Sequence, residues 1–168
     1  LTNHIRKNGF LNGIITNDPK GVEDKESILK DLSKWKGING QDLAKIVSTK
    51  KIYIWKEKEI SDLSQDIEQI DKHIVVIDYG VKSNILRCLS SRFNKITVVP
   101  CETGVSDIKN LKPDGIFLSN GPGDPVATGE YAIPIVKKLI SMEIPIFGIC
   151  LGHQILALAL GGETFKMH

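Results

Sequence analysis

One cysteine occupies a position suited to nucleophilic chemistry. Cys150 stands in GICLGHQ (residues 148–154), between an apolar run typical of a buried strand and a helical pattern over residues 151–161. A sharp turn from strand to helix exposes such a nucleophile, and flanking glycines leave room for the two backbones. The helix N-terminus favours the thiolate form of Cys150, and the backbone amide of Leu151 is then placed to stabilise an oxyanion. The same residues also fit a buried cysteine that ends a hydrophobic strand.

A second glycine-rich turn follows another expected strand. SNGPGDP (residues 119–125) places Gly121 and Gly123 on either side of a proline, a pattern typical of a rigid turn whose backbone amides are free to bind an anion or an amide oxygen. Neither this turn nor DYG (78–80) matches a Walker A loop or a GxGxxG fingerprint, so an ATP or nicotinamide site on this chain is poorly supported. Taken singly, the turn is typical of a plain surface loop. Together with Cys150 it predicts an oxyanion hole.

Both turns are expected at the same edge of a parallel sheet. Apolar runs typical of strands alternate with helical patterns: strands at 73–78, 95–100, 114–120 and 144–150, and helices at 81–93, 106–111, 128–142 and 151–161. This alternation predicts an α/β fold, with a mostly parallel sheet and helices on both faces. Ligands of such sheets bind at the carboxyl ends of the strands, where both glycine-rich turns stand.

The first part of the chain has a different composition. Residues 1–72 carry 25 charged side chains, whereas the longer part 73–168 carries 17. A domain boundary is therefore expected near Lys72, with the charged segment 54–73 as an exposed linker or a short solvated helix. Within the first part, a helix is predicted over 28–35 and a strand over 51–55.

The overall composition narrows the class of protein. The 168 residues are 41% hydrophobic and 25% charged, and 22 basic against 20 acidic side chains leave a net charge of +2. These values are typical of a globular chain and argue against a nucleic-acid partner. No apolar run is long enough to span a bilayer, and the N-terminus has no signal-peptide pattern. No membrane partner is therefore expected, and a cytoplasmic location is the default.

The three cysteines are too few and too far apart for a disulfide framework or a zinc site. No metal site is predicted. Cys88, in a helical pattern, and Cys101, just after a strand, are each expected to be a small buried hydrophobic residue.

The two motifs together resemble a known family. SNGPGDP and GICLGHQ closely match the class I (triad) glutamine amidotransferases, which hydrolyse glutamine to glutamate and ammonia. The form GxCLGHQ looks like the subset that serves carbamoyl-phosphate, anthranilate and aminodeoxychorismate synthesis. Residues 1–15, 37–49 and 78–87 are similar to the small-subunit family of carbamoyl-phosphate synthetases and not to the anthranilate proteins. The resemblance therefore covers essentially the whole chain.

The resemblance implies roles for individual residues. Cys150 would attack the side-chain amide of glutamine and form a γ-glutamyl thioester. Gly123 and Leu151 would donate backbone amides to the oxyanion. Gly121 and Gln154 would help to bind the glutamine.

The resemblance also implies what this chain lacks. The family's base and its orienting acid form a His-x-Glu pair well after the nucleophile, so the catalytic His and Glu are expected to be absent from this chain. His153 is expected to pack or orient the elbow helix, and His168 is a poor candidate for the base. We expect a fragment truncated at both ends. Residues 1–72 would be the C-terminal part of a smaller N-terminal domain plus a linker, and 73–168 the N-terminal part of an incomplete amidotransferase domain.

Two classes of function stay open. In the first, the chain belongs to an enzyme subunit that passes ammonia to a large synthetase subunit, which makes carbamoyl phosphate from bicarbonate and ATP for pyrimidine or arginine synthesis. ATP and magnesium would bind to that large subunit, and this subunit would need no cofactor. In the second, the chain is an inactive fragment that only binds the large subunit. The glutaminase subunit of an anthranilate or aminodeoxychorismate synthase is a further alternative.

Residues 1–168 alone are predicted to show little or no glutaminase activity, because the groups that manage protons for Cys150 are expected elsewhere. Ammonia release from the isolated chain measures this, and an electrophilic glutamine analogue tests whether Cys150 is still alkylated. Robust ammonia release that disappears on Cys150→Ala would show that the absent pair is not needed.

Overall fold

The computed structural model describes residues 2–9, 12–17, 24–56 and 69–165. The middle of the predicted linker and His168 lie outside these residues. The chain divides into two compact units, one that includes Leu1–Asn39 and one over Gly40–Phe165. The candidate site residues all belong to the second unit.

The described residues of the first unit form the helices α1 (Thr2–Asn8) and α3 (Lys25–Lys34). The Asp24 side chain caps α3, since it accepts a hydrogen bond from the Ser27 amide at 3.0 Å. The predicted helix over 28–35 is therefore present, with its start set by this cap. Neither helix has a buried residue.

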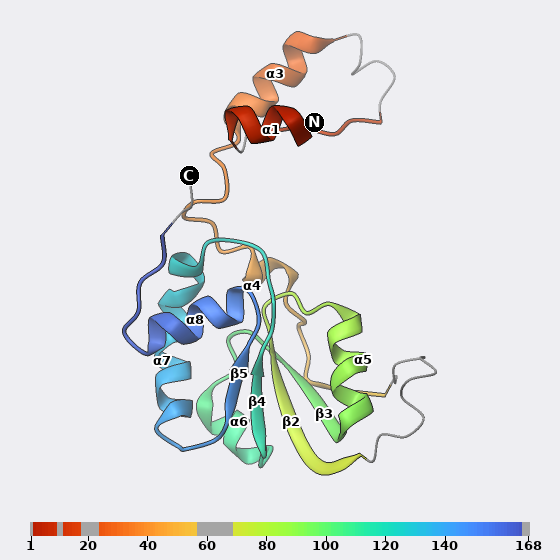
Figure 1. Ribbon diagram of the computed structural model, residues 1–168, viewed down its shortest axis with the longest axis vertical. Coiled ribbons are helices and arrows are strands. Elements are labelled where there is room, and N and C mark those ends of the chain that lie inside the picture. Colours follow the sequence, from red (N-terminus) through yellow and green to blue (C-terminus); the bar gives the residue numbers. More distant parts are fainter. Residues whose placement is uncertain (1, 10–11, 18–23, 57–68, 166–168) are drawn as a thin grey trace. The chain divides into compact units, whose positions relative to one another are not determined.

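The second unit is built around a five-stranded sheet (Figure 1). Its elements are α4 (Ala44–Val47), β1 (Tyr53–Trp55), β2 (Ile70–Asp78), α5 (Ser83–Arg92), β3 (Phe93–Pro100), α6 (Val105–Asn110), β4 (Gly115–Leu118), α7 (Pro125–Ile140), β5 (Ile146–Gly148) and α8 (Leu151–Ala159). The strand order is β1-β3-β2-β4-β5, and every pairing is parallel except that of β1 with β3. The predicted α/β class with a mostly parallel sheet is confirmed.

Helices cover both faces of the sheet, because alternate residues of a strand point to opposite sides. Ile77 of β2 packs on one side in a cluster with Ala132 of α7 and Ile155 of α8. Val76 packs on the other side in a cluster with Leu86 of α5. Figure 1 shows α5 separated by the sheet from α7 and α8. The prediction of helices on both faces is therefore also confirmed.

Cys88 corrects one expectation. It is exposed, so its predicted burial is wrong, whereas Cys101 is buried as predicted. The buried residues of α5 are Leu86 and Ser90, which lie one turn apart on the stripe that faces the sheet. Cys88 is two residues from each of them and falls outside that stripe.

Residues 40–56 pack with the second unit, although they precede the boundary predicted near residue 72. Ala44 is fully buried in the core cluster of the sheet, and Tyr53–Trp55 forms an edge strand of the same sheet. This packing does not test the boundary, which stays a prediction.

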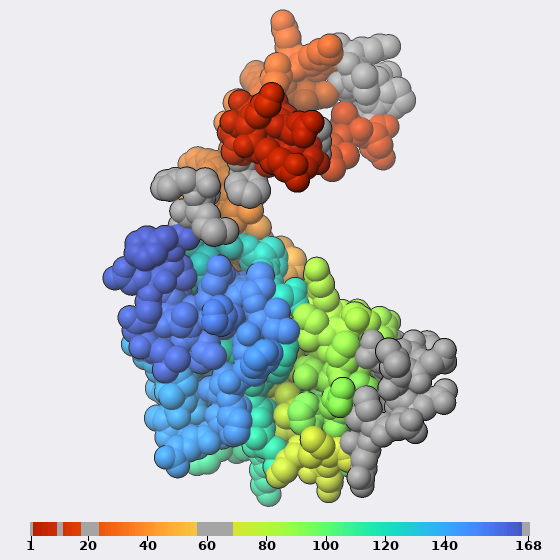
Figure 2. Space-filling view, in the orientation of Figure 1, coloured from red at the N-terminus to blue at the C-terminus, as the bar shows by residue number. Residues whose placement is uncertain are grey.

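An apolar groove lies beside β5, the edge strand on the opposite side of the sheet from β1. It has a volume of about 620 Å³ and is lined mainly by side chains of α5, β4 and β5. Phe147 of β5 is 63% exposed, and its ring centroid lies 5.9 Å from that of Phe117. Figure 2 shows one face of this unit, on which both the light-green residues of α5 and the blue residues of the later strands and helices are visible. An exposed aromatic ring on an edge strand makes this surface prone to association.

Phe147→Lys is predicted to reduce association of the isolated chain, because it places a charge at the sheet edge. Light scattering and the sedimented monomer fraction measure the effect. Leu160→Lys is the matched control, since Leu160 is 68% exposed but does not line the groove. If Phe147→Lys and Leu160→Lys raised the monomer fraction equally, the groove would make no specific contribution to association.

Candidate active site

Cys150 lies at a sharp turn between a strand and a helix. β5 ends at Gly148, and α8 begins at Leu151. Between them Cys150 has φ 53° and ψ −115°, a conformation that residues with a side chain rarely adopt. The residue is exposed, and its carbonyl accepts a hydrogen bond from the Gln154 amide at 3.0 Å. The strand, turn and helix expected around the cysteine are therefore present.

Two glycines allow α8 to approach the sheet closely. A Cβ on Gly148 would lie 2.7 Å from the backbone of Gly152, and a Cβ on Gly152 would overlap the carbonyl of Leu118. Because both conflicts are with backbone atoms, no side-chain movement would relieve them. Only glycine fits at these two positions in this arrangement.

Ser119 connects the elbow to the neighbouring strands. It is fully buried. Its carbonyl accepts the Gly152 amide at 3.0 Å, and its amide donates to the Ile77 carbonyl at 3.2 Å. Its hydroxyl accepts the Tyr79 amide at 2.8 Å. Sequence reasoning missed this residue, because a serine at the end of a strand is common and its three partners are distant in the chain.

The glycine-rich turn begins where β4 ends and lies against the loop after β2. The Asn120 side chain donates to the Gly80 carbonyl at 2.9 Å and accepts from the Lys82 amide at 3.1 Å. A Cβ on Gly121 would overlap the Tyr79 carbonyl. The first half of the turn is thus fixed by side-chain hydrogen bonds and by a close backbone contact.

A buried carboxylate organises the loop after β2. Asp78 is 5% exposed, and its Oδ1 accepts from the amides of Gly80 and Val81, each at 2.8 Å. Its Oδ2 accepts from the Thr49 amide at 2.7 Å. Sequence reasoning considered DYG only as a possible dinucleotide turn and missed this role. An Asp followed closely by Gly is nevertheless a common turn signal.

The five predicted site residues lie at the carboxyl ends of the strands. Cys150, Leu151 and Gln154 are at the start of α8, while Gly121 and Gly123 are on the turn after β4. β4 and β5 are paired neighbours, so both segments leave the sheet at the carboxyl ends of adjacent parallel strands. Gln154 is exposed and accessible to a ligand. The roles of the five residues toward glutamine stay predictions.

Two of these residues carry unpaired backbone amides. In the part of the chain that the structure describes, neither the Leu151 nor the Gly123 amide makes a hydrogen bond. Leu151 is the first residue of α8, where an amide has no partner within the helix. Gly123 has φ 106°, which favours glycine. Both amides are therefore available to an oxyanion.

No described histidine is hydrogen-bonded to the Cys150 thiol. His153 is exposed, and its part in packing or orientation within the elbow helix stays a prediction. His73 is buried near the start of β2, where its ring bonds to Thr97 Oγ1 at 2.8 Å. Burial, followed by the charge of Lys95, lowers the pKa of His73, which favours its neutral form.

Neither a metal site nor a spanning helix is found among the described residues. Within ranges 2–9, 12–17, 24–56 and 69–165, no three His, Cys, Asp or Glu side chains come together as metal ligands. None of the described helices has the length and apolarity to cross a membrane. The groups that the site presents are a thiol, backbone amides and the Gln154 side chain.

The sequence of this chain is similar to those of known proteins. The family described as Glutamine amidotransferase class-I matches residues 75–168. The whole chain is similar to proteins named carbamoyl phosphate synthase small chain. It is 49% identical to that of Rhizobium meliloti, 50% to that of Mesorhizobium japonicum and 47% to that of Zymomonas mobilis. Each comparison covers 100% of this chain but only 43%, 43% and 46% of the respective relative. The chain thus spans less than half the length of these curated relatives.

Cys150→Gly is predicted to be more stable than Cys150→Ala by about 1 kcal/mol, because the combination of φ 53° with ψ −115° lies outside the left-handed region that other residues adopt and suits glycine. Urea unfolding of the two variants measures this difference. The same pair of changes at Cys88, inside α5, is the control and should give the opposite sign, since glycine costs a helix interior about 1 kcal/mol relative to alanine. Equal stability of the two Cys150 variants would contradict strain at the elbow.

Proposed function

The chain belongs to the glutamine amidotransferase class-I family, and from this premise we propose that it forms the glutamine-hydrolysing part of a carbamoyl-phosphate synthetase small subunit. One observation carries the proposal. Cys150 is exposed at a turn of positive φ, directly before the unpaired amide that begins α8. This is the geometry that a nucleophile needs in order to reach a bound amide while a donor stabilises the charge that develops.

The first half of the proposed reaction releases ammonia. The Cys150 thiolate attacks the side-chain carbonyl carbon of glutamine, and the carbonyl electron pair moves to the oxygen. The Leu151 and Gly123 amides donate hydrogen bonds to this oxyanion. When the intermediate collapses, the C–N bond breaks and the nitrogen takes a proton and leaves as ammonia. A γ-glutamyl thioester remains on Cys150.

The second half regenerates the enzyme. Water adds to the thioester carbonyl, and the same two amides stabilise the second oxyanion. The C–S bond then breaks, glutamate leaves and the thiol of Cys150 is restored. In this proposal Gly121 and Gln154 hold the glutamine during both halves.

Proton transfer in both halves requires a base with an orienting acid. We assign this pair to a part of the longer polypeptide outside the described residues. Two observations support the assignment. No described histidine is hydrogen-bonded to Cys150, and the similar relatives are more than twice as long as this chain.

The proposed partner is a large synthetase subunit that consumes the ammonia with bicarbonate and ATP. ATP and magnesium then bind to that subunit, and this chain needs no cofactor. The similarity to carbamoyl phosphate synthase small chains extends through residues 1–74, outside the family match. This extension favours carbamoyl phosphate over the anthranilate alternative. The proposal includes the domain boundary near Lys72 and a cytoplasmic location.

Cys150→Ser in the full-length small subunit, assembled with its large subunit, is predicted to reduce glutamine hydrolysis by at least about 10³-fold, because a hydroxyl replaces the thiolate. Synthesis from added ammonia should continue, since it bypasses Cys150. Ammonia release and carbamoyl phosphate formation are the two measurements.

Cys88→Ser is the matched control, because Cys88 is also exposed but lies on α5, away from the elbow. It should leave both rates unchanged. Unaltered glutamine hydrolysis in Cys150→Ser would refute the proposed nucleophile. Binding of the large subunit with no glutamine hydrolysis even in the unsubstituted protein would favour the binding-module alternative.

A further inference from the structure

The second half of the glycine-rich turn lies against a segment from far earlier in the chain. The Asp124 amide donates to the Gln41 carbonyl at 2.9 Å, and the Gly40 amide donates to Oδ2 of Asp124 at 2.7 Å. A Cβ on Gly123 would lie 2.8 Å from both the Gln41 carbonyl oxygen and the Leu43 amide nitrogen. Gly123 is therefore in close backbone contact with Gly40–Leu43, which we call the brace.

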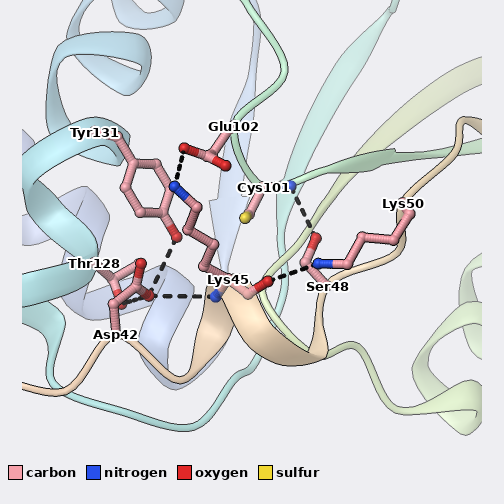
Figure 3. Close-up of polar contacts among 8 residues, drawn as sticks. All are labelled: Asp42, Lys45, Ser48, Lys50, Cys101, Glu102, Thr128 and Tyr131. Carbon is pink, nitrogen blue, oxygen red and sulfur yellow. Dashed lines mark hydrogen bonds and ion pairs between the residues drawn. The ribbon is translucent and has the colours of Figure 1, made fainter.

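Asp42 ties the brace to α7 (Figure 3). Its Oδ1 accepts hydrogen bonds from the Thr128 hydroxyl at 3.0 Å and the Tyr131 hydroxyl at 3.4 Å. The same oxygen accepts the Lys45 amide at 3.3 Å, in the first turn of α4. Thr128 is fully buried. Because Asp124 caps α7, the brace and the glycine-rich turn are both anchored to the start of one helix.

The donors around Asp42 are neutral hydroxyls and a backbone amide. Burial, followed by a hydrogen bond with the Cys101 thiol, raises the pKa of Tyr131, so its hydroxyl stays protonated and continues to donate. The Lys45 ammonium pairs instead with Glu102 at 2.7 Å. Asp42 therefore serves as a fixed hydrogen-bond acceptor in this cluster.

The two halves of the turn have separate supports. Asn120 and Gly121 are held by the loop after β2, and the elbow is held through Ser119. Gly123 is backed by the brace. A change in the brace would therefore move the Gly123 amide while the nucleophile stays in place.

We propose that Gly40–Leu43 orients the Gly123 amide toward the oxyanion, and that Asp42 is the positioning residue that holds this brace. The inference rests on the proposed glutaminase function and adds to it a determinant remote from the elbow in sequence. Asp42 acts through Gly123 and does not touch glutamine. Loss of one oxyanion donor typically lowers a rate by about 10²–10³-fold, and a misdirected donor should cost less than its loss.

The test uses the full-length small subunit assembled with its large subunit. Asp42→Ala should lower kcat for glutamine hydrolysis by about tenfold to a hundredfold with little change in KM, because the donor acts mainly on the transition state. Alkylation of Cys150 by iodoacetamide needs no oxyanion hole, so its rate and pH profile should not change. Asp42→Asn keeps the Oδ1 acceptor and should restore kcat to within about threefold of the unsubstituted protein.

Three further variants separate a positioning role from general damage to the fold. Glu102→Gln removes a neighbouring ion pair without touching the brace and should leave kcat unchanged. When Gly123 is already replaced by alanine, Asp42→Ala should lower kcat by less than a further factor of about two, because both changes act on the same donor. Thr128→Val removes one partner of Asp42 with little change of shape. If Asp42→Ala does not fold, Thr128→Val takes its place in the test and should lower kcat by a smaller factor.

The inference is overturned if Asp42→Ala slows alkylation of Cys150 as much as glutamine hydrolysis. It is overturned too if Asp42→Ala lowers kcat by the same factor with and without the Gly123→Ala change. It is also overturned if Asp42→Ala and Thr128→Val both leave kcat unchanged while Cys150→Ser abolishes hydrolysis, a result that would leave the proposed function standing. Absence of Cys150-dependent glutamine hydrolysis in the unsubstituted assembly would instead overturn the proposed function, and this inference with it.

Discussion

The contact between Gly152 and the end of β4 is the constraint on which the site depends. It brings the first turn of α8 against the backbone of Leu118, with no space for a side chain between them. The chain must then turn sharply between Gly148 and Leu151, and this turn forces Cys150 into a positive φ. Exposure of the thiol and the unpaired amide at Leu151 follow from the same turn. A small change in the helix-to-sheet distance would therefore move the Cys150 side chain and the Leu151 amide together.

The Gly123 amide, the second proposed donor, depends on different parts of the chain. Gly123 lies on a turn that Asn120 attaches to the loop after β2 on one side and that the brace supports on the other. A carboxylate organises each support: the buried Asp78 in the loop and the partly buried Asp42 in the brace. In the proposed oxyanion hole, the Leu151 amide is thus local to Cys150, whereas the tertiary fold has to place the Gly123 amide.

The sequence predicted the elements better than their pairing. Buried runs such as residues 73–78 and helical patterns such as 151–161 have clear periods, so the parallel core of the sheet could be predicted. The antiparallel edge strand β1 has no local signal of direction, because its partner β3 lies some forty residues later. The burial of Cys88 was mispredicted, since a helical pattern does not fix which stripe faces the sheet. The motif residues were found because glycines on either side of a proline or of a cysteine, directly after an apolar run, form a distinctive local pattern. Ser119 was missed because serine is ordinary in loops.

The bond between Gly40 and Asp124 joins residues that are 84 positions apart. Closing a flexible loop of that size costs about 4 kcal/mol of chain entropy, which only the surrounding contacts can offset. Contacts of such long range slow folding, because the loop entropy is lost before the contact stabilises the chain. On a growing chain, Gly40 leaves the ribosome well before its partner exists, whereas β5 and the elbow are made almost together. The elbow therefore forms from residues that are made together, whereas the support of Gly123 joins one segment that is made early to another that is made much later.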